Sequence, residues 1–452
     1  MQVIVIETAA LGDRSYVVAQ DGVAVVVDPQ RDIDRVLAAV PSGASIAYVL
    51  ETHVHNDYVS GGLELARRTG GQYVIAAADD VAFPRTPVRD GEVLTAGSLS
   101  ITALHTPGHT PQHLSYLVVD GDGDGDGDGA VFTGGSLLYG TVGRTDLIGA
   151  EQTEELTGAQ YRSVRRLADT LPASTSVHPT HGFGSFCASA GSAGDTAEST
   201  IGHQRGQNLA CTTADEQTFV RTMLGGLTAY PAYYAHMAPI NRAGPAPLDL
   251  APPFEVAVAQ LGKRAAAGAW VVDVRQRRLF AESHVAGTVN VELGDSLPTY
   301  LGWVLPWGTP VVLAGDHAGD VEEAQRMLAL IGIDHPEARA VGVSATAEAT
   351  ASYPMTDFAE LAQVRMQRQL TVLDVRRDDE WRDGHIAGAV HVPLPELDDR
   401  LDELPGEPLW VHCASGFRAA IAASLLDRAG RDVVLVDDEF TRAAAAGLEL
   451  TS

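Results

Sequence analysis

The sequence is poor in cysteine and in positive charge. Only three cysteines occur in 452 residues, at positions 187, 211 and 413. They are too few and too scattered for a disulfide framework, and in a reducing compartment they are expected to be buried fillers or reactive thiols. Lys and Arg together number 31 against 59 Asp and Glu, so the formal net charge is −28. A chain this acidic repels phosphate backbones and anionic lipids, which argues against nucleic-acid and membrane-surface partners.

Long apolar runs are also missing. No stretch approaches the roughly 18 apolar residues of a membrane span. The first residues, MQVIVIETAALGDRSYVV, lack the basic start and long apolar segment of a secretion signal. We therefore expect a cytoplasmic protein with no membrane partner. Hydrophobic residues still make up 45% of the chain, which excludes wholesale disorder, and the length predicts about three domains.

Residues 1–240 read as a β-rich domain. Turn residues separate β-branched runs, which predicts strands at 2–6, 16–20, 23–27, 46–50, 99–104, 114–119 and 130–133. A helix is expected over 62–69. The acidic repeat DGDGDGDGDG at 120–129 is expected to be a solvated hairpin loop, because Thr133 stands where a calcium loop needs glutamate.

The rest of the chain contains an internal repeat. A linker is expected at 239–254, which holds five prolines. After it, VVDVRQRRLFAESHVAGTVNV (271–291) matches VLDVRRDDEWRDGHIAGAVHV (372–392). Each copy is followed by a second apolar strand, at 311–314 or 409–412, and then by a helical pattern. The pattern predicts two tandem α/β domains with parallel sheets, at 255–345 and 355–452.

Histidines cluster at three places in the first domain. THVHND (52–57) follows a predicted strand, TPGHT (106–110) contains a turn that displays its histidine, and HPTHG (178–182) comes later. Imidazoles at i and i+2 in a loop can converge on one metal, and a nearby carboxylate can join or orient them. The candidate metal ligands are His53, His55, Asp57 and His109.

A cysteine loop marks the last domain. A predicted strand ends at His412, the loop CASGFR (413–418) follows, and a helix is expected over 419–429. Backbone N–H groups of such a loop, including those at Ser415 and Gly416, and the helix N-terminus favour a thiolate at Cys413. Arg418 adds a charge that can hold an oxyanion. A thiolate so placed can accept sulfane sulfur and carry it as a persulfide.

The corresponding loop of the first repeat, LAGDHAG (313–319), has no cysteine. It cannot relay sulfur, so that domain is expected to be inactive and to serve as a spacer or docking surface. The pattern Cys-x-x-Gly-x-Arg alone also fits phosphatases. The upstream DVR (374–376), Glu380 and GHIAGA (384–389) resemble the rhodanese pattern, which favours sulfur transfer. That upstream set is expected to act as a structural hydrogen-bond network.

The histidine motifs resemble those of the metallo-β-lactamase superfamily. The runs VFTGGSLLYGTVGRTDL (131–147) and HPTHGFGSFC (178–187) are closer to its persulfide dioxygenase branch. The resemblance implies an αββα sandwich at 1–240, followed by an inactive and an active rhodanese-like domain. It further implies one Fe(II) per chain, with zinc as the alternative, and histidine ligands at His53 and His109.

The same resemblance implies oxidation of glutathione persulfide or a similar persulfide by O₂ to sulfite. Sulfite could then accept sulfur from the Cys413 persulfide to give thiosulfate, which amounts to sulfide detoxification. It implies substrate contacts at Arg144, His181 and Cys187, although Cys187 could equally be a small buried apolar residue. Homo-oligomerisation stays open.

Two positions depart from the family pattern. Gly135 stands where the third iron ligand, an Asp, is expected, and Tyr58 stands where many members have His. His55 could complete a three-histidine site, Asp57 could supply the carboxylate, or the metal site could be degenerate. One alternative is a zinc-dependent thioester hydrolase of the glyoxalase II type, which Gly135 and Tyr58 disfavour because a two-metal site needs ligands there. The other is a sulfur carrier whose first domain has lost catalysis.

Overall fold

A computed structural model describes residues 1–121, 129–188, 198–346, 351–406 and 408–452. The chain forms two compact units. Unit 1 comprises Met1–Leu248 with Ala329–Gly332, and unit 2 comprises Asp249–Leu328 with Ile333–Ser452. The predicted acidic loop lies mostly at 122–128, outside the described residues. Among the described helices, none is long and apolar enough to cross a membrane.

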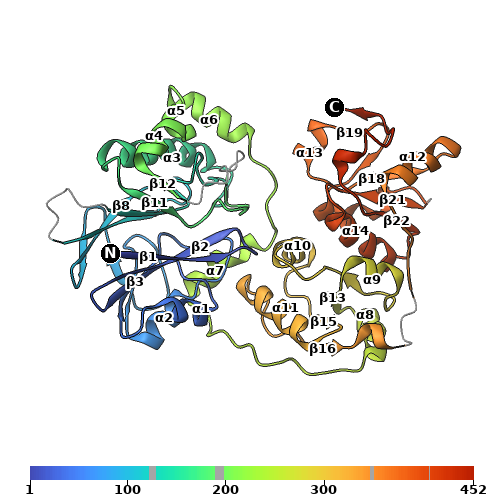
Figure 1. Cartoon of the computed structure of the whole chain (residues 1–452), viewed down its shortest axis with the longest axis horizontal. Coiled ribbons are helices and arrows are strands. Elements are labelled where there is room, and N and C mark those ends of the chain that lie inside the picture. The colour runs from blue at the N-terminus through green and yellow to red at the C-terminus, as the bar shows by residue number, and fades with distance from the viewer. Residues whose placement is uncertain (122–128, 189–197, 347–350, 407) are drawn as a thin grey trace. The chain divides into compact units, whose positions relative to one another are not determined.

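Unit 1 is a sandwich of two six-stranded sheets (Figure 1). The first sheet has the order β1-β2-β3-β4-β5-β6: Gln2–Thr8, Asp13–Gln20, Val23–Val27, Ser45–Leu50, Gln72–Ala76 and Thr86–Val88. The second has the order β12-β11-β10-β9-β8-β7: Ser199–Thr200, Ser176–Pro179, Ala130–Gly134, Leu114–Asp120, Leu99–His105 and Val93–Ala96. All seven predicted strands of this region are confirmed.

Side chains along each strand point alternately to the two faces of its sheet. On β2, Tyr16 and Val18 enter the apolar core between the two sheets, which also contains Leu99 and Phe132. Their neighbour Val17 points to the opposite face, because successive side chains of a strand alternate. Each sheet therefore has one face for its partner sheet and one for helices.

Helices cover both outer faces. On the first sheet these are α1 (Ile33–Ala39), α2 (Gly62–Thr69) and α7 (Tyr234–Ala243), whose apolar residues share one core cluster. The second sheet is covered by α3 (Thr153–Thr170), α4 (Ile201–Gln207), α5 (Leu209–Thr212) and α6 (Glu216–Gly225). The expected αββα sandwich and the helix at 62–69 are confirmed.

The expected linker start at residue 239 is wrong. Helix α7 continues to Ala243 with Pro239 inside it. Its last turn is held by Asn241, whose Nδ2 donates to the carbonyls of His55 and Tyr58 and whose Oδ1 accepts from the Ser60 amide. These hydrogen bonds tie the helix to the first histidine loop and offset the cost of an internal proline.

Unit 2 contains two parallel sheets. One has the order β14-β13-β15-β16: Val289–Asn290, Trp270–Asp273, Val311–Gly315 and Ala338–Val341. The other has the order β17-β22-β21-β18-β20: Met355–Thr356, Val433–Val436, Leu409–His412, Thr371–Asp374 and Val390–His391. Strands β19 (His385–Ile386) and β23 (Leu450–Thr451) pair separately.

The α-helices of unit 2 are α8 (Leu261–Ala266), α9 (Arg277–Glu282), α10 (Leu297–Val304), α11 (Ala318–Leu330), α12 (Phe358–Gln367), α13 (Asp378–Asp383) and α14 (Phe417–Arg428). The 3₁₀ helices are η1 (Val258–Gln260), η2 (Val343–Ala345), η3 (Leu394–Glu396), η4 (Asp398–Glu403) and η5 (Phe440–Arg442).

The sequence repeat folds the same way twice. Arg275 pairs with Asp273 at 2.7 Å, and Arg376 pairs with Asp374 at 2.7 Å. In both copies the guanidinium also donates to a carbonyl eight residues further along the chain. Each buried pair therefore pins the loop after a central strand, which is a structural role.

Candidate metal centre and cysteine loop

Three histidines on separate loops of unit 1 meet at one end of the sandwich. His53 follows β4, His109 follows β8 and His181 follows β11, and each is at most 1% exposed. Their potential ligand atoms all lie within 4.8 Å of one another. The Nε2 atoms of His53 and His181 are 3.4 Å apart. Three imidazoles grouped this tightly can hold one transition-metal ion. We call them the three-histidine group.

The backbone fixes the tautomer of His109. Its Nδ1 lies 2.7 Å from the carbonyl oxygen of Arg144. A carbonyl only accepts, so Nδ1 has the proton and Nε2 has the lone pair. That Nε2 is buried and has no hydrogen-bond partner among the described residues. A buried lone pair without a donor fits a ligand of a cation.

Two carboxylates orient the other two rings. The Thr52 hydroxyl donates to Asp28 at 2.7 Å, so its oxygen accepts from Nδ1 of His53 at 2.9 Å. His181 donates from Nδ1 to Asp13 at 2.8 Å. Both rings therefore present Nε2 to the centre of the group. Hydrogen bonds of this kind orient metal-binding imidazoles and increase their basicity.

The electrostatic surroundings differ among the three rings. Burial, followed by the neighbouring imidazoles, lowers the pKa of His109 to about 3 and the pKa of His53 well below its ordinary value. Burial also lowers the pKa of His181, but the carboxylates of Asp57 and Asp13 outweigh it and raise that pKa well above the ordinary value. Two rings with lowered pKa values thus lie beside one ring whose pKa is raised by the carboxylates of Asp57 and Asp13.

Position 135 leaves no room for a carboxylate. A Cβ added to Gly135 would lie 2.2 Å from Cδ2 of His109. A Cβ added to Gly143 would lie 2.3 Å from the Gly135 oxygen and 2.8 Å from Nδ1 of His109. The His109 ring thus occupies the space beside these two glycines, and the third imidazole comes from His181.

His55 lies in a second, acidic group. Its Nε2 is 3.3 Å from Asp28 and 3.3 Å from Glu51, and 2.9 Å from the Tyr58 hydroxyl. Burial lowers the pKa of His55, but these two carboxylates outweigh burial and raise it to about 9. The expectation that His55 completes a set with His53 and His109 stays a prediction.

Asp57 faces His181 and Cys187. Its Oδ2 is 3.2 Å from Nδ1 of His181. Burial raises the pKa of Asp57, but the charge of His181 outweighs burial and lowers it. Burial and then Asp57 raise the pKa of the Cys187 thiol well above its ordinary value, so the thiol is protonated. The predicted ligand role of Asp57 and the predicted substrate contacts of His181 and Cys187 stay predictions.

The side chain of Arg144 is surrounded by protein groups. Its guanidinium donates to Asp146 at 2.7 and 2.8 Å and to the carbonyls of Phe186 and Thr228. Its own carbonyl accepts from His109. Arg144 therefore positions a histidine of the three-histidine group through its backbone. Its predicted substrate contact stays a prediction.

Sequence reasoning missed the residues that orient the histidines. Gln160 on α3 accepts from the His109 amide at 2.6 Å. His113, also fully buried, accepts from the Gly135 amide at 3.1 Å. Neither belongs to a local motif, and neither do Asp13 and Asp28. Only the place of Gln160, a polar residue among the buried residues of the amphipathic helix α3, could have singled it out.

The cysteine loop of unit 2 joins β21 to α14. Cys413 is 1% exposed and Ser415 is exposed. Gly416 has φ of +86°, and a Cβ there would lie 2.1 Å from Oδ1 of Asp437. Only glycine fits this bend, because it tolerates positive φ and the carboxylate lies against it. Gly416 therefore fixes the conformation of the loop directly before the first residue of α14.

Arg418 is paired within the protein. Its guanidinium binds Glu380 through two hydrogen bonds of 2.5 and 2.8 Å. Burial lowers the pKa of Arg418, but this pair outweighs burial and raises it. The charge that was predicted to hold an oxyanion is therefore partly neutralised. The predicted roles of Cys413, Arg418, Ser415 and Gly416 stay predictions.

The corresponding loop after β15 is held by an acidic side chain. Asp316 accepts from the Ser344 amide and from the Ser344 hydroxyl, both at 2.7 Å. No thiol stands in this loop. Without a nucleophile, this loop has no group that could carry sulfur.

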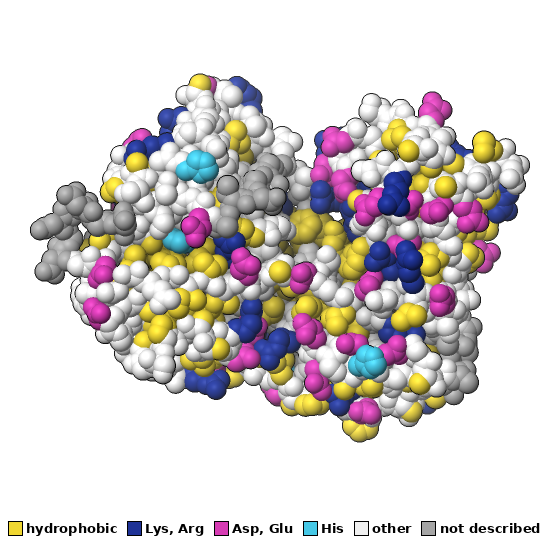
Figure 2. All heavy atoms as spheres, in the orientation of Figure 1, with side chains coloured by type: hydrophobic (Ala, Val, Ile, Leu, Met, Phe, Trp, Pro, Cys, Tyr) yellow, Lys and Arg dark blue, Asp and Glu magenta, His cyan; other side chains and the backbone are white. Residues whose placement is uncertain are grey.

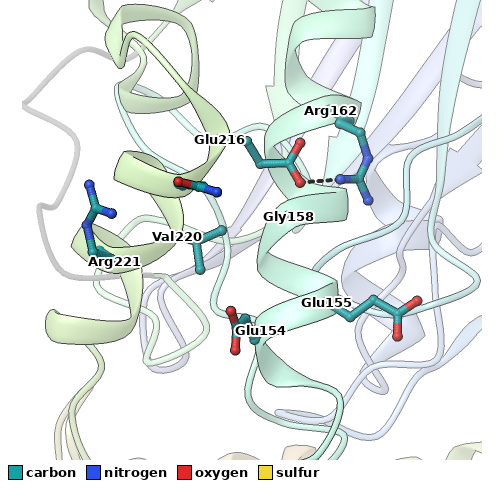
Figure 3. Close-up of a pocket in the computed structure, with 8 residues that line it drawn as sticks. Glu154, Glu155, Gly158, Arg162, Glu216, Val220 and Arg221 are labelled. Atoms are coloured by element: carbon teal, nitrogen blue, oxygen red, sulfur yellow. Dashed lines mark hydrogen bonds and ion pairs between the residues drawn. The ribbon is translucent and has the colours of Figure 1, made fainter.

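A separate groove lies between α3 and α6 (Figure 3). Glu154, Gly158 and Arg162 line it from α3, and Glu216 pairs with Arg162 across it. Both partners of this pair are exposed to solvent. None of its lining residues belongs to the three-histidine group. Exposed pairs of this kind contribute little to stability.

Two family profiles match the chain. Residues 11–181 match the Metallo-beta-lactamase superfamily, and residues 357–446 match the Rhodanese-like domain. A metallo-beta-lactamase from Staphylococcus aureus subsp. aureus COL has a similar crystal structure, with 26% identity and a TM-score of 0.67 over 75% of this chain and 99% of that one. The structure of ETHE1 from Myxococcus xanthus matches with 26% identity and a TM-score of 0.45, over 54% of this chain and 99% of that one.

Curated relatives match in sequence. A probable metallo-hydrolase of Burkholderia pseudomallei (strain 1710b) is 33% identical over 175 residues, 33% of this chain and 57% of that protein. A hydroxyacylglutathione hydrolase of Methylococcus capsulatus is 35% identical over 162 residues, 35% of this chain and 57% of that protein. The chain thus spans little more than half the length of these relatives. Its architecture is a metallo-beta-lactamase fold followed by a C-terminal rhodanese-like domain.

Proposed function

We propose that unit 1 oxidises a low-molecular-weight persulfide, such as glutathione persulfide, to sulfite at one non-haem iron held by His53, His109 and His181. The proposal rests on the three buried imidazoles whose Nε2 atoms converge, of which that of His109 has no hydrogen-bond partner in the part of the chain that the structure describes. Tyr58 and Gly135 supply no ligands for a second metal. This donor set suits a single redox-active ion better than a pair of hydrolytic zinc ions. Bound iron would supply the activation of O₂.

The surrounding residues have defined tasks in this proposal. Asp13 and Thr52 keep Nε2 of their histidines directed inward, and Gln160 holds the His109 backbone. Burial of all three rings excludes bulk water. In the balanced reaction a persulfide, O₂ and water give the thiol, sulfite and two protons. The outer sulfur is oxidised and O₂ is reduced.

In unit 2, we propose that Cys413 transfers sulfur. Its thiolate takes the outer sulfur of a donor and becomes a persulfide. Sulfite then attacks that outer sulfur, so the new S–S bond of thiosulfate forms and the Cys413 thiolate leaves. Residues 255–345 are proposed to be another rhodanese-like domain, one without cysteine, since their sheet has the same Asp–Arg pair as the Cys413 domain. The low cysteine content supports a cytoplasmic location.

Metal analysis and oxygen uptake test the oxidation. Protein reconstituted anaerobically with Fe(II) is expected to bind about one iron per chain and to consume O₂ when glutathione persulfide is added. His53→Ala and His181→Ala are expected to lose both iron and uptake. His203→Ala removes an exposed histidine of α4 and serves as the matched control. If iron-free protein results under all conditions, only sulfur transfer through Cys413 would remain.

Zinc-dependent thioester hydrolysis is the second candidate. The hydroxyacylglutathione hydrolases among the relatives favour it. It requires two metals, for which positions 58 and 135 offer no ligands. Two zinc ions per chain together with hydrolysis of a hydroxyacylglutathione would replace the oxidation proposal.

A further inference from the structure

Residues 255–345, the cysteine-free half of unit 2, reach the Cys413 loop. Tyr300 on α10 packs its ring on Phe417, with centroids 5.5 Å apart, and Phe417 is the first residue of α14 after the loop. The ring of Trp303 stacks on Tyr300, with centroids 5.9 Å apart. Two helices from different halves of the repeat thus meet at the mouth of this loop (Figure 1).

The half-buried Tyr300 hydroxyl is an available donor beside charged groups. Burial raises the pKa of Tyr300, and Arg418, Glu380 and Cys413 all act on it through their charges. Within the described part of the chain, no side chain or carbonyl hydrogen-bonds to this hydroxyl. Arg418, in contrast, is occupied by Glu380. The Tyr300 hydroxyl is therefore available to donate a hydrogen bond to a substrate at Cys413.

The cysteine-free half also contacts the Cys413 loop through a carboxylate that packs against it. Arg277 donates to Oδ1 of Asp437 at 2.8 Å, and Arg278 donates to Oδ2 at 3.0 Å. Asp437 is the carboxylate that lies against Gly416. On the far side of α14, the Asn290 amide of β14 donates to Ser424 at 3.0 Å. These contacts join α9 and β14 of the cysteine-free half to the Cys413 loop and to α14, and the ring contact of Tyr300 with Phe417 adds α10.

We propose that Tyr300 is a positioning residue of the sulfur-transfer site, whose hydroxyl donates a hydrogen bond to an oxygen of an oxyanion acceptor such as sulfite. The cysteine-free half then forms one wall of the Cys413 site and contributes to its choice of acceptor. In the step concerned, a sulfite lone pair attacks the outer sulfur of the Cys413 persulfide, the S–S bond to Cys413 breaks, and thiolate is released. This inference rests on the proposed sulfur transfer through Cys413.

Acceptor selectivity in the full-length Tyr300→Phe variant tests this role. The substitution keeps the ring contact with Phe417 and removes only the hydroxyl. Cys413 is loaded anaerobically from glutathione persulfide and then discharged to sulfite or to cyanide. Discharge to sulfite is expected to slow about tenfold, the loss expected for one hydrogen bond to a charged oxygen. Discharge to cyanide, which has no oxygen, is expected to change less than twofold.

Two controls separate the possible outcomes. Tyr353→Phe removes another hydroxyl of unit 2, one that is buried with no hydrogen-bond partner among the described residues, and is expected to leave both rates unchanged. Equal slowing with sulfite and cyanide in Tyr300→Phe, or no slowing at all, would overturn the role of Tyr300. If Cys413→Ser still discharges sulfur, the sulfur-transfer proposal itself fails.

Discussion

At the residue scale, space decides which side chain can complete the metal centre. His109 fills the volume beside Gly135 and Gly143. A carboxylate at position 135 therefore has no space, because the His109 ring occupies the volume that its side chain would need. His181, the third member of the three-histidine group, lies 128 residues after His53 in the sequence. No local pattern reveals that meeting, which is why the sequence predicted His55 and Asp57 as the partners.

Restoring the family carboxylate is not expected to restore the family site. Gly135→Asp should lower iron content and destabilise unit 1 by about 1–3 kcal/mol, since its Cβ collides with the His109 ring. Gly206→Asp adds the same carboxylate on α4, where nothing lies within 4 Å of the Cβ, and should retain iron. Iron content by mass spectrometry and thermal unfolding measure both effects. Higher iron content and faster oxygen uptake in Gly135→Asp would exclude His181 as the third ligand.

Asp79 makes stability depend on pH. Burial, opposed by Arg242 and Arg85, raises its pKa from 3.8 to about 6. The folded state therefore binds this proton more tightly than the unfolded chain, and the resulting stability is lost as pH rises from 3.8 through 6. Asp79→Asn should stabilise the protein by about 2–3 kcal/mol above pH 7 and have little effect below pH 4.

Denaturant unfolding at several pH values checks this dependence. Asp80→Asn removes the same formal charge from an exposed neighbour and should change stability by under about 0.5 kcal/mol at any pH. A gain for Asp79→Asn that is equal at pH 4 and pH 8 would contradict the assigned cause.

At the element scale, the strands were predictable and several helices were not. Runs of β-branched residues between turn residues predicted β2, β3, β8 and β9, and β2 and β3 have both faces in an apolar core. The end of α7 was missed, since Pro239 argues against a helix while Asn241 holds its last turn through tertiary hydrogen bonds. The Cys413 loop was predictable because strand, loop and helix are contiguous. The contact of α10 with that loop was not, as it joins two halves of unit 2.

Both ends of α14 have a left-handed glycine, but only one is crowded. Gly416 has φ of +86° and its Cβ would meet Asp437, whereas Gly430 has φ of +74° and open space. Gly416→Ala should displace the loop and abolish sulfur transfer through Cys413. Gly430→Ala should cost about 1 kcal/mol of stability and keep the activity. Thiosulfate:cyanide sulfurtransfer and thermal unfolding are the measurements, and an active Gly416→Ala variant would show that the loop conformation is not required.

At the scale of the whole molecule, charge is the dominant feature. The chain has a net charge of −28, and on the face shown in Figure 2 acidic side chains are interspersed with basic ones over both units. Its proposed substrates, persulfide, sulfite and thiosulfate, are themselves anions. Long-range repulsion must therefore oppose their approach, and short-range groups such as Tyr300 and the loop N–H groups must provide the attraction.

Salt should accordingly increase the rate of encounter with anionic acceptors. Raising ionic strength from about 0.01 to 0.1 M shortens the screening length from about 30 to 10 Å. The kcat/KM for sulfite at Cys413 should then rise roughly two- to threefold while kcat stays unchanged, because only the approach is screened. Hydrogen cyanide, which is neutral at pH 7, is the matched acceptor and should show no salt dependence. A fall in kcat/KM for sulfite with salt would mean that the paired arginines around Cys413 attract anions more strongly than the whole chain repels them.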